Sequence, residues 1–148
     1  MNSFLIEIQI VLILFIGDDQ GQCCCVELPG DKVQFIRNQP YHTNHFLSTE
    51  NYKGFVGTPR YQHSINRFQR LEQIWNSRQS LEEILFDCND EIQTHPICRL
   101  YKPADIGMVG TVCSIIMNLK ERTLNITKGS PRHNREFIQY KINKNQST

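Results

Sequence analysis

The sequence has almost no excess of either charge. It contains 16 Lys and Arg residues against 15 Asp and Glu residues, so the formal net charge is +1. A chain with so little net charge offers no general attraction for a polyanion, and we expect no nucleic-acid partner. The last third is locally basic, but its cations are spaced as on solvated strand faces and a loop: Lys120, Arg122, Lys128, Arg132 and Arg135.

The sequence also has no long apolar run. Ile8 to Ile16 is nearly all apolar, interrupted by Gln9. This is far shorter than the roughly 20 residues of a membrane span, so we expect no membrane partner. A signal peptide needs a basic first region, and no Lys or Arg precedes Lys32. We therefore predict a cytoplasmic protein, with secretion as the alternative, and a strand over residues 4–16 that is buried on both faces.

The six cysteines do not have the spacing of a structural metal site, because no C-x-x-C pairs occur. Cys23, Cys24 and Cys25 are adjacent, so they alternate between the faces of a strand and do not pair easily. Cys88, Cys98 and Cys113 are scattered. We interpret all six as reduced structural thiols. The alternative is a small secreted disulfide protein, which predicts that a thiol titration finds no free cysteine.

His42 and His45 lie near the cysteine run in the sequence and suggest a zinc site. Their spacing fits no standard zinc pattern. We therefore expect no metal and no organic cofactor.

The 148 residues are 39% hydrophobic, which suits a single domain with a real core. Alternating polarity, β-branched residues and turn signals predict antiparallel strands in two sets. A hairpin turn is expected at Gly17–Gly21. After the strand at 4–16, the expected strands cover residues 22–28, 32–37, 110–119, 123–127 and 136–142.

Two helices are expected between these sets of strands. Residues 61–77 carry apolar side chains at helical spacing, and we assign Trp75 to the core. Ser80 begins a second helix over 81–87, because Ser80 and Glu83 form a capping-box pattern. Residues 38–59 are expected to be mostly irregular, and residues 89–110 to form a long loop. This order predicts an α+β fold with layered packing.

Two polar motifs stand out against this background: Thr43-Asn44-His45-Phe46 and Ser64-Ile65-Asn66-Arg67-Phe68-Gln69-Arg70. An asparagine at a strand end can donate its side-chain amide to a developing oxyanion. A helical arginine can hold a thiolate, carboxylate or carbonyl with its planar fork. The plain alternatives are a loop asparagine bonded to its own backbone and arginines solvated on a helix.

These motifs, in this order, resemble the acyl-coenzyme A:6-aminopenicillanic acid acyltransferase family, also called peptidase family C45. The resemblance runs over about residues 20–140 and rests on an ordered set of short pieces. They are Gly21–Glu27, Thr43–Phe46, Ser64-x-x-Arg67, Ile84-Leu85-x-Asp87, Ile97-Cys98-Arg99, Gly110–Ser114 and Gly129-Ser130-Pro131.

The resemblance implies part of an N-terminal-nucleophile αββα sandwich. In that family a cysteine at the chain's own N-terminus attacks a linear amide or thioester carbonyl, and its free α-amine serves as the base. The family's oxyanion donor falls on Asn44. The arginine near the nucleophile falls on Arg67 or Arg70, depending on which motif is aligned. The implied substrates are small acyl amides or thioesters, with acyl-CoA as one candidate, and no cofactor is implied.

The sequence departs from the family at the nucleophile, because Met1-Asn2-Ser3 offers no cysteine. We therefore expect residues 1–148 to form a single domain that is the C-terminal half of the acyltransferase domain, inactive alone. A complementary chain carrying the nucleophile is one expectation. The alternative is a non-catalytic interaction domain derived from this fold.

Overall fold

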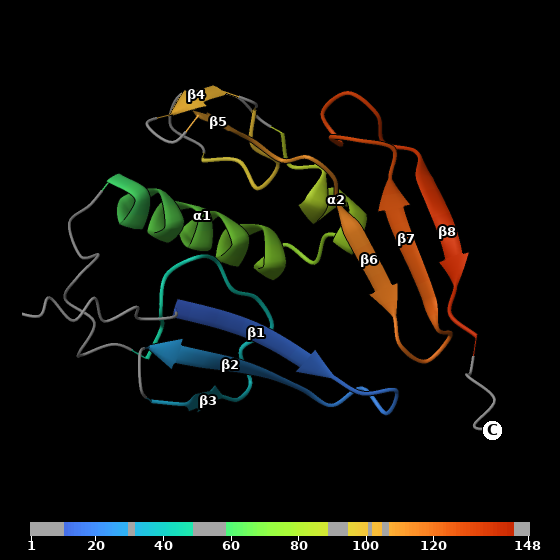
Figure 1. The fold of residues 1–148 in the computed structure, drawn as a ribbon, viewed down its shortest axis with the longest axis horizontal. Coiled ribbons are helices and arrows are strands. Elements are labelled where there is room, and N and C mark those ends of the chain that lie inside the picture. The colour runs from blue at the N-terminus through green and yellow to red at the C-terminus, as the bar shows by residue number, and fades with distance from the viewer. Residues whose placement is uncertain are drawn as a thin grey trace, which may run out of the picture.

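The computed structural model describes residues 11–29, 32–48, 59–88, 95–100, 102–104 and 107–143. In this part of the chain, two three-stranded antiparallel sheets and one two-stranded hairpin accompany two helices (Figure 1). The predicted α+β fold class, with antiparallel strands and two helices, is confirmed. The arrangement is consistent with part of an N-terminal-nucleophile sandwich.

The first sheet consists of β1 (Val11–Gly17), β2 (Cys23–Pro29) and β3 (Gln34–Ile36), in that order. The predicted hairpin turn joins the first two strands. The Asp18 carboxylate accepts hydrogen bonds from the backbone N–H groups of Gln20 and Gln22, at 2.9 and 2.8 Å. Gly21 has a φ of +83°, which glycine adopts without strain.

The prediction that the first strand is buried on both faces is wrong for its described part. Residues 4–10 lie outside the described residues. Leu12, Leu14 and Ile16 point to one face and Phe15 to the other, and all four are 40–55% exposed. The apolar run indicated a strand correctly, but burial depends on a neighbouring layer. No described element covers the face that carries Leu12, Leu14 and Ile16.

The second sheet has the order β6 (Ile115–Asn118), β7 (Thr123–Thr127) and β8 (Phe137–Lys141). β6 begins later than the predicted residue 110, because backbone N–H groups before it bond elsewhere. The Thr111 N–H donates to the Arg99 carbonyl at 3.0 Å, and the Ser114 N–H donates to the Thr127 side-chain oxygen at 2.8 Å.

Helix α1 (Pro59–Asn76) spans the long predicted helix. Its buried stripe comprises Ser64, Leu71 and Ile74. Trp75 is 38% exposed, so its assignment to the core is wrong. The stripe is rotated from the expected one because Leu71 and Ile74 pack with Ile84 of the second helix.

Helix α2 (Leu81–Leu85) is shorter than predicted, but its start is confirmed. The Glu83 N–H donates to Ser80 Oγ at 3.2 Å, and the Ser80 N–H donates to the Glu83 carboxylate at 2.7 Å. This reciprocal capping box satisfies two N–H groups at the helix start. Ile84 then completes the core cluster with α1, and Tyr41 and Ile97 pack against that cluster.

The predicted long loop at 89–110 contains a small hairpin that the sequence did not indicate. It is formed by β4 (Lys102–Ala104) and β5 (Gly107–Val109). Strands this short carry no measurable periodicity, and Pro103 argues against a strand in any sequence pattern. Residues 89–94, 101, 105 and 106 lie outside the described residues.

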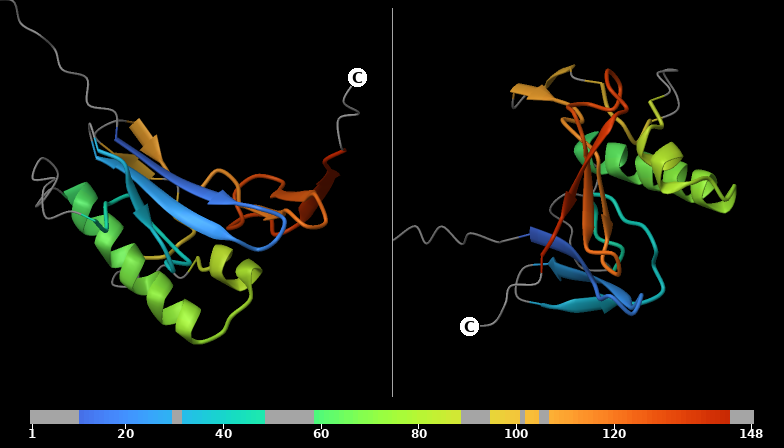
Figure 2. Two further views of the ribbon diagram at one scale, coloured as in Figure 1. Left: turned by 90° about the horizontal axis from the view of Figure 1, so that it is seen from below. Right: turned by 90° about the vertical axis from the view of Figure 1, so that its right-hand side faces the viewer.

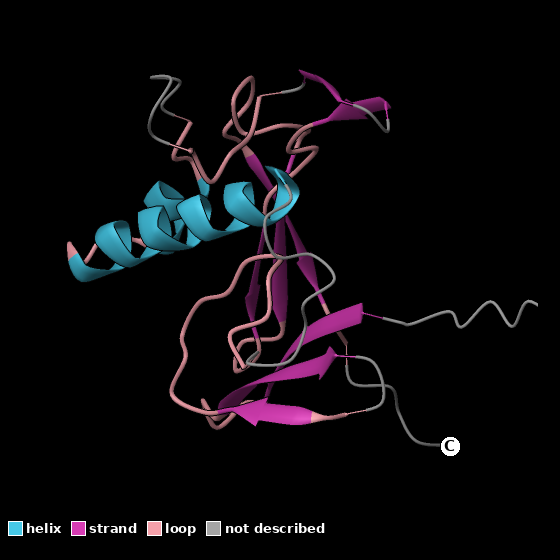
Figure 3. Cartoon of the chain, turned by 90° about the vertical axis from the view of Figure 1, so that its left-hand side faces the viewer, coloured by secondary structure: helices cyan, strands magenta, loops and turns pink. Residues whose placement is uncertain are grey.

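The helices lie to one side of the β6–β7–β8 sheet (Figure 2). Loop segments fill the space between the helices and the β1–β2–β3 sheet (Figure 3). After β3 the chain rises toward α1 before it reaches the helix (Figure 1). This connection is therefore held between a strand layer and a helix, and it carries Asn44.

Both sheets present open apolar faces. On the second sheet, Ile115, Met117, Ile138 and Tyr140 share one face by register, and all are exposed. Phe35 of the first sheet is 66% exposed, on the same face as Leu14. Apolar surface of this extent favours association.

We predict that the isolated chain self-associates through these faces. Replacing the most exposed apolar residue named on each face, Phe35→Gln with Met117→Gln, should shift the mass in sedimentation velocity toward the monomer. Gln139→Ala, on the opposite face of the second sheet, is the control and should leave the mass unchanged. A monodisperse, cooperatively melting wild-type monomer contradicts the prediction.

Candidate active site around Asn44

The segment of residues 42–48, here called the asparagine loop, is held on its sheet side by one buried carboxylate. Glu27 of β2 has no exposed surface. Its Oε1 accepts from His42 Nε2 and from the Leu47 N–H, both at 2.6 Å. Its Oε2 accepts from the Ser48 N–H at 3.1 Å and from the Ser48 hydroxyl. A single side chain thereby fixes both ends of the loop.

Burial opposes ionisation of Glu27, but the hydrogen bonds more than offset it. The bonds from Ser48, Leu47 and His42 favour the carboxylate, and the pKa of Glu27 lies below its ordinary value of 4.5. His42 Nδ1 also contacts the Thr43 carbonyl. The ring therefore bridges Glu27 on one side and the loop's own backbone on the other.

On its helix side, the asparagine loop is held by Ser64 of α1. The Thr43 hydroxyl donates to the Ser64 carbonyl at 2.9 Å. The Ser64 hydroxyl lies 3.0 Å from both Thr43 Oγ1 and His45 Nδ1. Burial and then the charge of His42 lower the pKa of His45, which suits a neutral ring that accepts at Nδ1.

The Ser64 hydroxyl and the His45 ring are close enough to act as a nucleophile and its base, but the Ser64 hydroxyl is too buried to react with a substrate. Ser64 is only 2% exposed and its oxygen is occupied by the asparagine loop. A substrate carbonyl cannot reach such a hydroxyl. The pair therefore anchors the loop.

The Asn44 side chain is exposed and contacts Arg67. Arg67 lies on α1, one turn beyond Ser64. Arg67 Nη2 donates to Asn44 Oδ1 at 2.6 Å. A guanidinium has no acceptor, so the amide must present its oxygen to Arg67. No described residue accepts a hydrogen bond from the Asn44 amide nitrogen, so both of its hydrogens are available to another partner.

The Ser64-x-x-Arg67 spacing now has a physical meaning. Residues three apart lie on the same face of a helix. Ser64 holds the residues on either side of Asn44, and Arg67 holds the Asn44 side chain. Asn44 itself lies at a bend within irregular backbone, so its expected position at a strand end is wrong. Its orientation comes from α1.

Arg70 lies apart from Asn44 in the hydrogen-bond network. Its Nε and Nη2 donate to the two carboxylate oxygens of Asp87, at 3.1 and 2.8 Å. The bonds and charge of Asp87 raise the pKa of Arg70. Asp87 also accepts from the Ile97 N–H at 3.3 Å, and its carbonyl accepts from the Cys98 N–H at 2.9 Å. Arg70 thus ties α1 to the segment after α2.

The described cysteines do not meet Asn44 or Arg67 in any hydrogen bond. Cys25 has no exposed surface, and burial and then the charge of Glu27 raise the pKa of its thiol. Burial and a hydrogen bond with buried Cys98 raise the pKa of Cys88 to about 12. A nucleophile needs a low pKa and access. All six cysteines are free, which fits the predicted reduced thiols.

Within the described ranges, no group of three or more His, Cys, Asp or Glu residues has the geometry to hold a metal ion. None of the described helices is long and apolar enough to cross a membrane.

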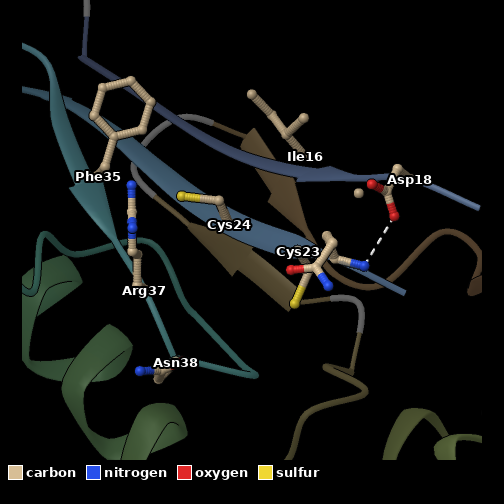
Figure 4. Close-up of a pocket in the computed structure, with 9 residues that line it drawn as sticks. Ile16, Asp18, Cys23, Cys24, Phe35, Arg37 and Asn38 are labelled. Atoms are coloured by element: carbon tan, nitrogen blue, oxygen red, sulfur yellow. Dashed lines mark hydrogen bonds between the residues drawn. The ribbon is translucent and has the colours of Figure 1, made fainter. Parts of the chain in front are cut away.

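An open pocket of about 730 Å³ lies at the turn end of the first sheet (Figure 4). Cys23, Cys24, Phe35 and Arg37 contribute to its lining. It contains none of the predicted site residues. Its floor is the exposed sheet surface, so we assign it to the open apolar face.

Sequence reasoning missed the residues that position Asn44: Glu27, His42 and Ser48. A signal was present. Glu27 is the only charged residue of β2 (Cys23–Pro29). A carboxylate in an otherwise apolar strand requires a set of donors if its side chain faces the interior. His42 and Ser48, which flank the predicted motif, supply them.

A family model described as acyl-coenzyme A:6-aminopenicillanic acid acyl-transferase matches residues 7–133. No curated protein and no solved structure matches the chain. The matched range contains every residue of the network around Asn44.

We predict that Glu27→Gln lowers the free energy of unfolding at pH 7 by about 3–5 kcal/mol, because it removes the charge from a buried, hydrogen-bonded pair. The folded pKa of Glu27 lies below 4.5. Its stabilisation is therefore complete above that pH and is lost as the pH falls through the folded pKa. Urea unfolding across this range should show the two proteins converging at low pH. Exposed Glu121→Gln is the control, and a pH-independent difference contradicts the prediction.

We predict that Arg70→Met lowers the free energy of unfolding by about 2 kcal/mol, the scale of hydrogen bonds between charged groups. Arg70 is partly buried and Asp87 more so, at 27% and 8% side-chain exposure. Arg78→Met, just beyond α1, is the matched control and should change little. Denaturant unfolding measures both, and equal midpoints for Arg70→Met and wild type contradict the assignment of Arg70 to the anchor.

Proposed function

Because the chain belongs to the acyl-coenzyme A:6-aminopenicillanic acid acyltransferase family, we propose that it forms the oxyanion-binding part of a cysteine-dependent enzyme acting on linear amides. The single observation that carries this proposal is the Arg67–Asn44 hydrogen bond of 2.6 Å. This bond occupies the Asn44 amide oxygen, so the exposed amide nitrogen is oriented and remains available as a donor. That is the donor a tetrahedral intermediate requires.

The reaction follows acyl-transfer chemistry. A cysteine thiolate attacks the carbonyl carbon of the acyl amide, and the carbonyl oxygen becomes an oxyanion. Asn44 Nδ2 donates a hydrogen bond to that oxygen. Collapse breaks the C–N bond, the amine leaves with a proton from the catalytic base, and a thioester remains. Water or a second amine then takes the acyl group, which gives hydrolysis or acyl transfer. An acyl-CoA thioester can enter at the first step instead.

Arg67 acts in this scheme as a positioning residue. It restrains the rotation of the Asn44 side chain, and the donors around Glu27 restrain its backbone through both ends of the asparagine loop. Donors fixed before the reaction need no reorganisation as charge develops. Arg70 is left out of the chemistry because both of its hydrogen bonds to described residues go to Asp87.

The nucleophile in this proposal lies outside the 148 residues, on a further segment or a complementary chain. The described cysteines support this. Cys25 and Cys98 are buried, and no described cysteine makes a hydrogen bond with Asn44 or Arg67. We propose that residues 1–148 are inactive without that segment.

The second candidate is a non-catalytic interaction domain. The observation that favours it is the open apolar surface of both sheets, including Phe35 and Met117. Such surface is the usual mark of a protein contact. The two candidates differ in one respect, since only the enzyme shows thiol-dependent turnover.

The test uses the native protein from its source, whose intact mass shows which polypeptide carries the cysteine. N-acyl amides and acyl-CoA thioesters are offered with and without iodoacetamide. Asn44→Ala in the native context should lower kcat by about 10²–10³-fold, the effect of losing one oxyanion donor. KM should change little, because the bond forms in the transition state.

Asn44→Asp should be as damaging, because a carboxylate of similar shape has no hydrogen to donate. Exposed Asn76→Ala, at the end of α1, is the control and should retain full turnover. Native protein without any iodoacetamide-sensitive turnover favours the interaction domain. Thiol-dependent turnover that survives Asn44→Ala removes Asn44 from the mechanism.

A further inference from the structure

Cys88 and Cys98 lie next to each other just after the end of α2. The Cys98 N–H donates to the Asp87 carbonyl at 2.9 Å. Asp87 immediately precedes Cys88, so the same bond brings Cys88 beside Cys98. Fixed covalent geometry then limits the Cα–Cα distance of the two cysteines to about 7 Å or less, and most disulfides span about 4.4–6.8 Å. The backbone therefore places the pair within reach of a disulfide bond.

The two thiols also meet. The Cys88 thiol makes a hydrogen bond with the Cys98 thiol, and both cysteines are free in this structure. Cys98 is only 1% exposed, whereas Cys88 is partly exposed. A reagent in solution therefore reaches the Cys88 sulfur first, and the Cys98 sulfur is in position to react with it next.

The backbone around the pair is fixed on both sides. The Asp87 carboxylate accepts from the Ile97 N–H at 3.3 Å and holds the Arg70 guanidinium through both of its oxygens. The Cys88 carbonyl accepts from Arg132 Nη1 at 3.1 Å. Groups that are already held in place lose little freedom when a bond forms between them, so their effective concentration is high. The folded chain therefore favours bond formation at this position.

We propose that Cys88 and Cys98 form an intramolecular disulfide bond when the chain meets a disulfide oxidant such as oxidised glutathione. This modification does not depend on the proposed function. The bond joins the end of α2 covalently to residues 95–99, which also contact α1, since the Asn66 side-chain amide lies 2.7 Å from His95 Nε2. In a reducing compartment the pair stays as two thiols.

The reaction is an exchange in two steps. Cys88 loses its proton to the solvent, and its thiolate attacks one sulfur of oxidised glutathione. The S–S bond of glutathione breaks, a mixed disulfide forms on Cys88, and one glutathione leaves. Cys98 then loses its proton, attacks the Cys88 sulfur and displaces the second glutathione. The protein gives up two electrons to the oxidant, and the two leaving thiolates take up the two protons.

The reaction is slow at neutral pH. Burial and the hydrogen bond with Cys98 raise the pKa of Cys88 to about 12, so the attacking thiolate is scarce. The equilibrium is unaffected by this barrier. The test therefore measures the equilibrium rather than the rate.

The whole chain is equilibrated with mixtures of reduced and oxidised glutathione at pH 8, with and without urea. Trypsin releases residues 79–99 as one peptide that contains both cysteines. In oxidised samples this peptide should be lighter by two hydrogen atoms, and cleavage after Glu91 should leave Cys88 and Cys98 on one linked product. The effective concentration of the pair should be roughly 30- to 1,000-fold higher in the folded chain than in urea, the range that matches the usual stabilisation by a disulfide.

Cys88→Ala should abolish the linked product and the rise in thermal midpoint that oxidation gives the wild-type chain. Cys113→Ala, which removes an exposed cysteine elsewhere in the sequence, is the control and should change neither.

Three results overturn the proposal. They are equal effective concentrations with and without urea, glutathione on Cys88 at equilibrium without the linked product, and a bond from Cys88 or Cys98 to a different cysteine. If Cys88→Ala fails to fold, the comparison of the folded and the urea-unfolded wild-type chain still decides.

Discussion

The candidate site depends on the buried carboxylate of Glu27. This group accepts from His42, Leu47 and Ser48, and the asparagine loop has no regular secondary structure to replace those bonds. An irregular segment between a strand and a helix must satisfy its backbone groups locally. A single ionised acceptor satisfies two backbone N–H groups at one end of the loop and holds the His42 ring at the other end. The position of Asn44 is therefore a consequence of a charge in the interior of β2.

Helix α1 contributes the opposite half of the same restraint. Ser64 holds the neighbours of Asn44, and Arg67 holds its side chain, while Arg70 on the next turn leads away to Asp87. The two arginines are three residues apart and have different partners. One orients a candidate catalytic amide, and the other joins the helix to the rest of the fold. Helix α1 therefore contributes different side chains to the site and to the hydrophobic core.

Much of the fold was predictable because local signals were strong. The hairpin turn, the capping box at Ser80 and the strand over residues 123–127 followed from turn chemistry and periodicity, and the structure contains them. The failures have physical causes. The β4–β5 hairpin is too short to have a period, and Trp75 is exposed because Leu71 and Ile74 face the short helix α2. Burial of β1 depended on a layer that the described elements do not provide.

The sequence by itself determined the family, the order of the elements and the residue types of the site, because these are properties of local pattern. It indicated Asn44, Arg67 and Arg70 as candidate site residues but did not show which arginine contacts Asn44. Only the tertiary structure separated the two arginines and revealed Glu27 as the support of the asparagine loop. The physical reason is distance along the chain. Glu27 and Asn44 are brought together by sheet and helix packing, and such contacts leave no periodic trace in the sequence.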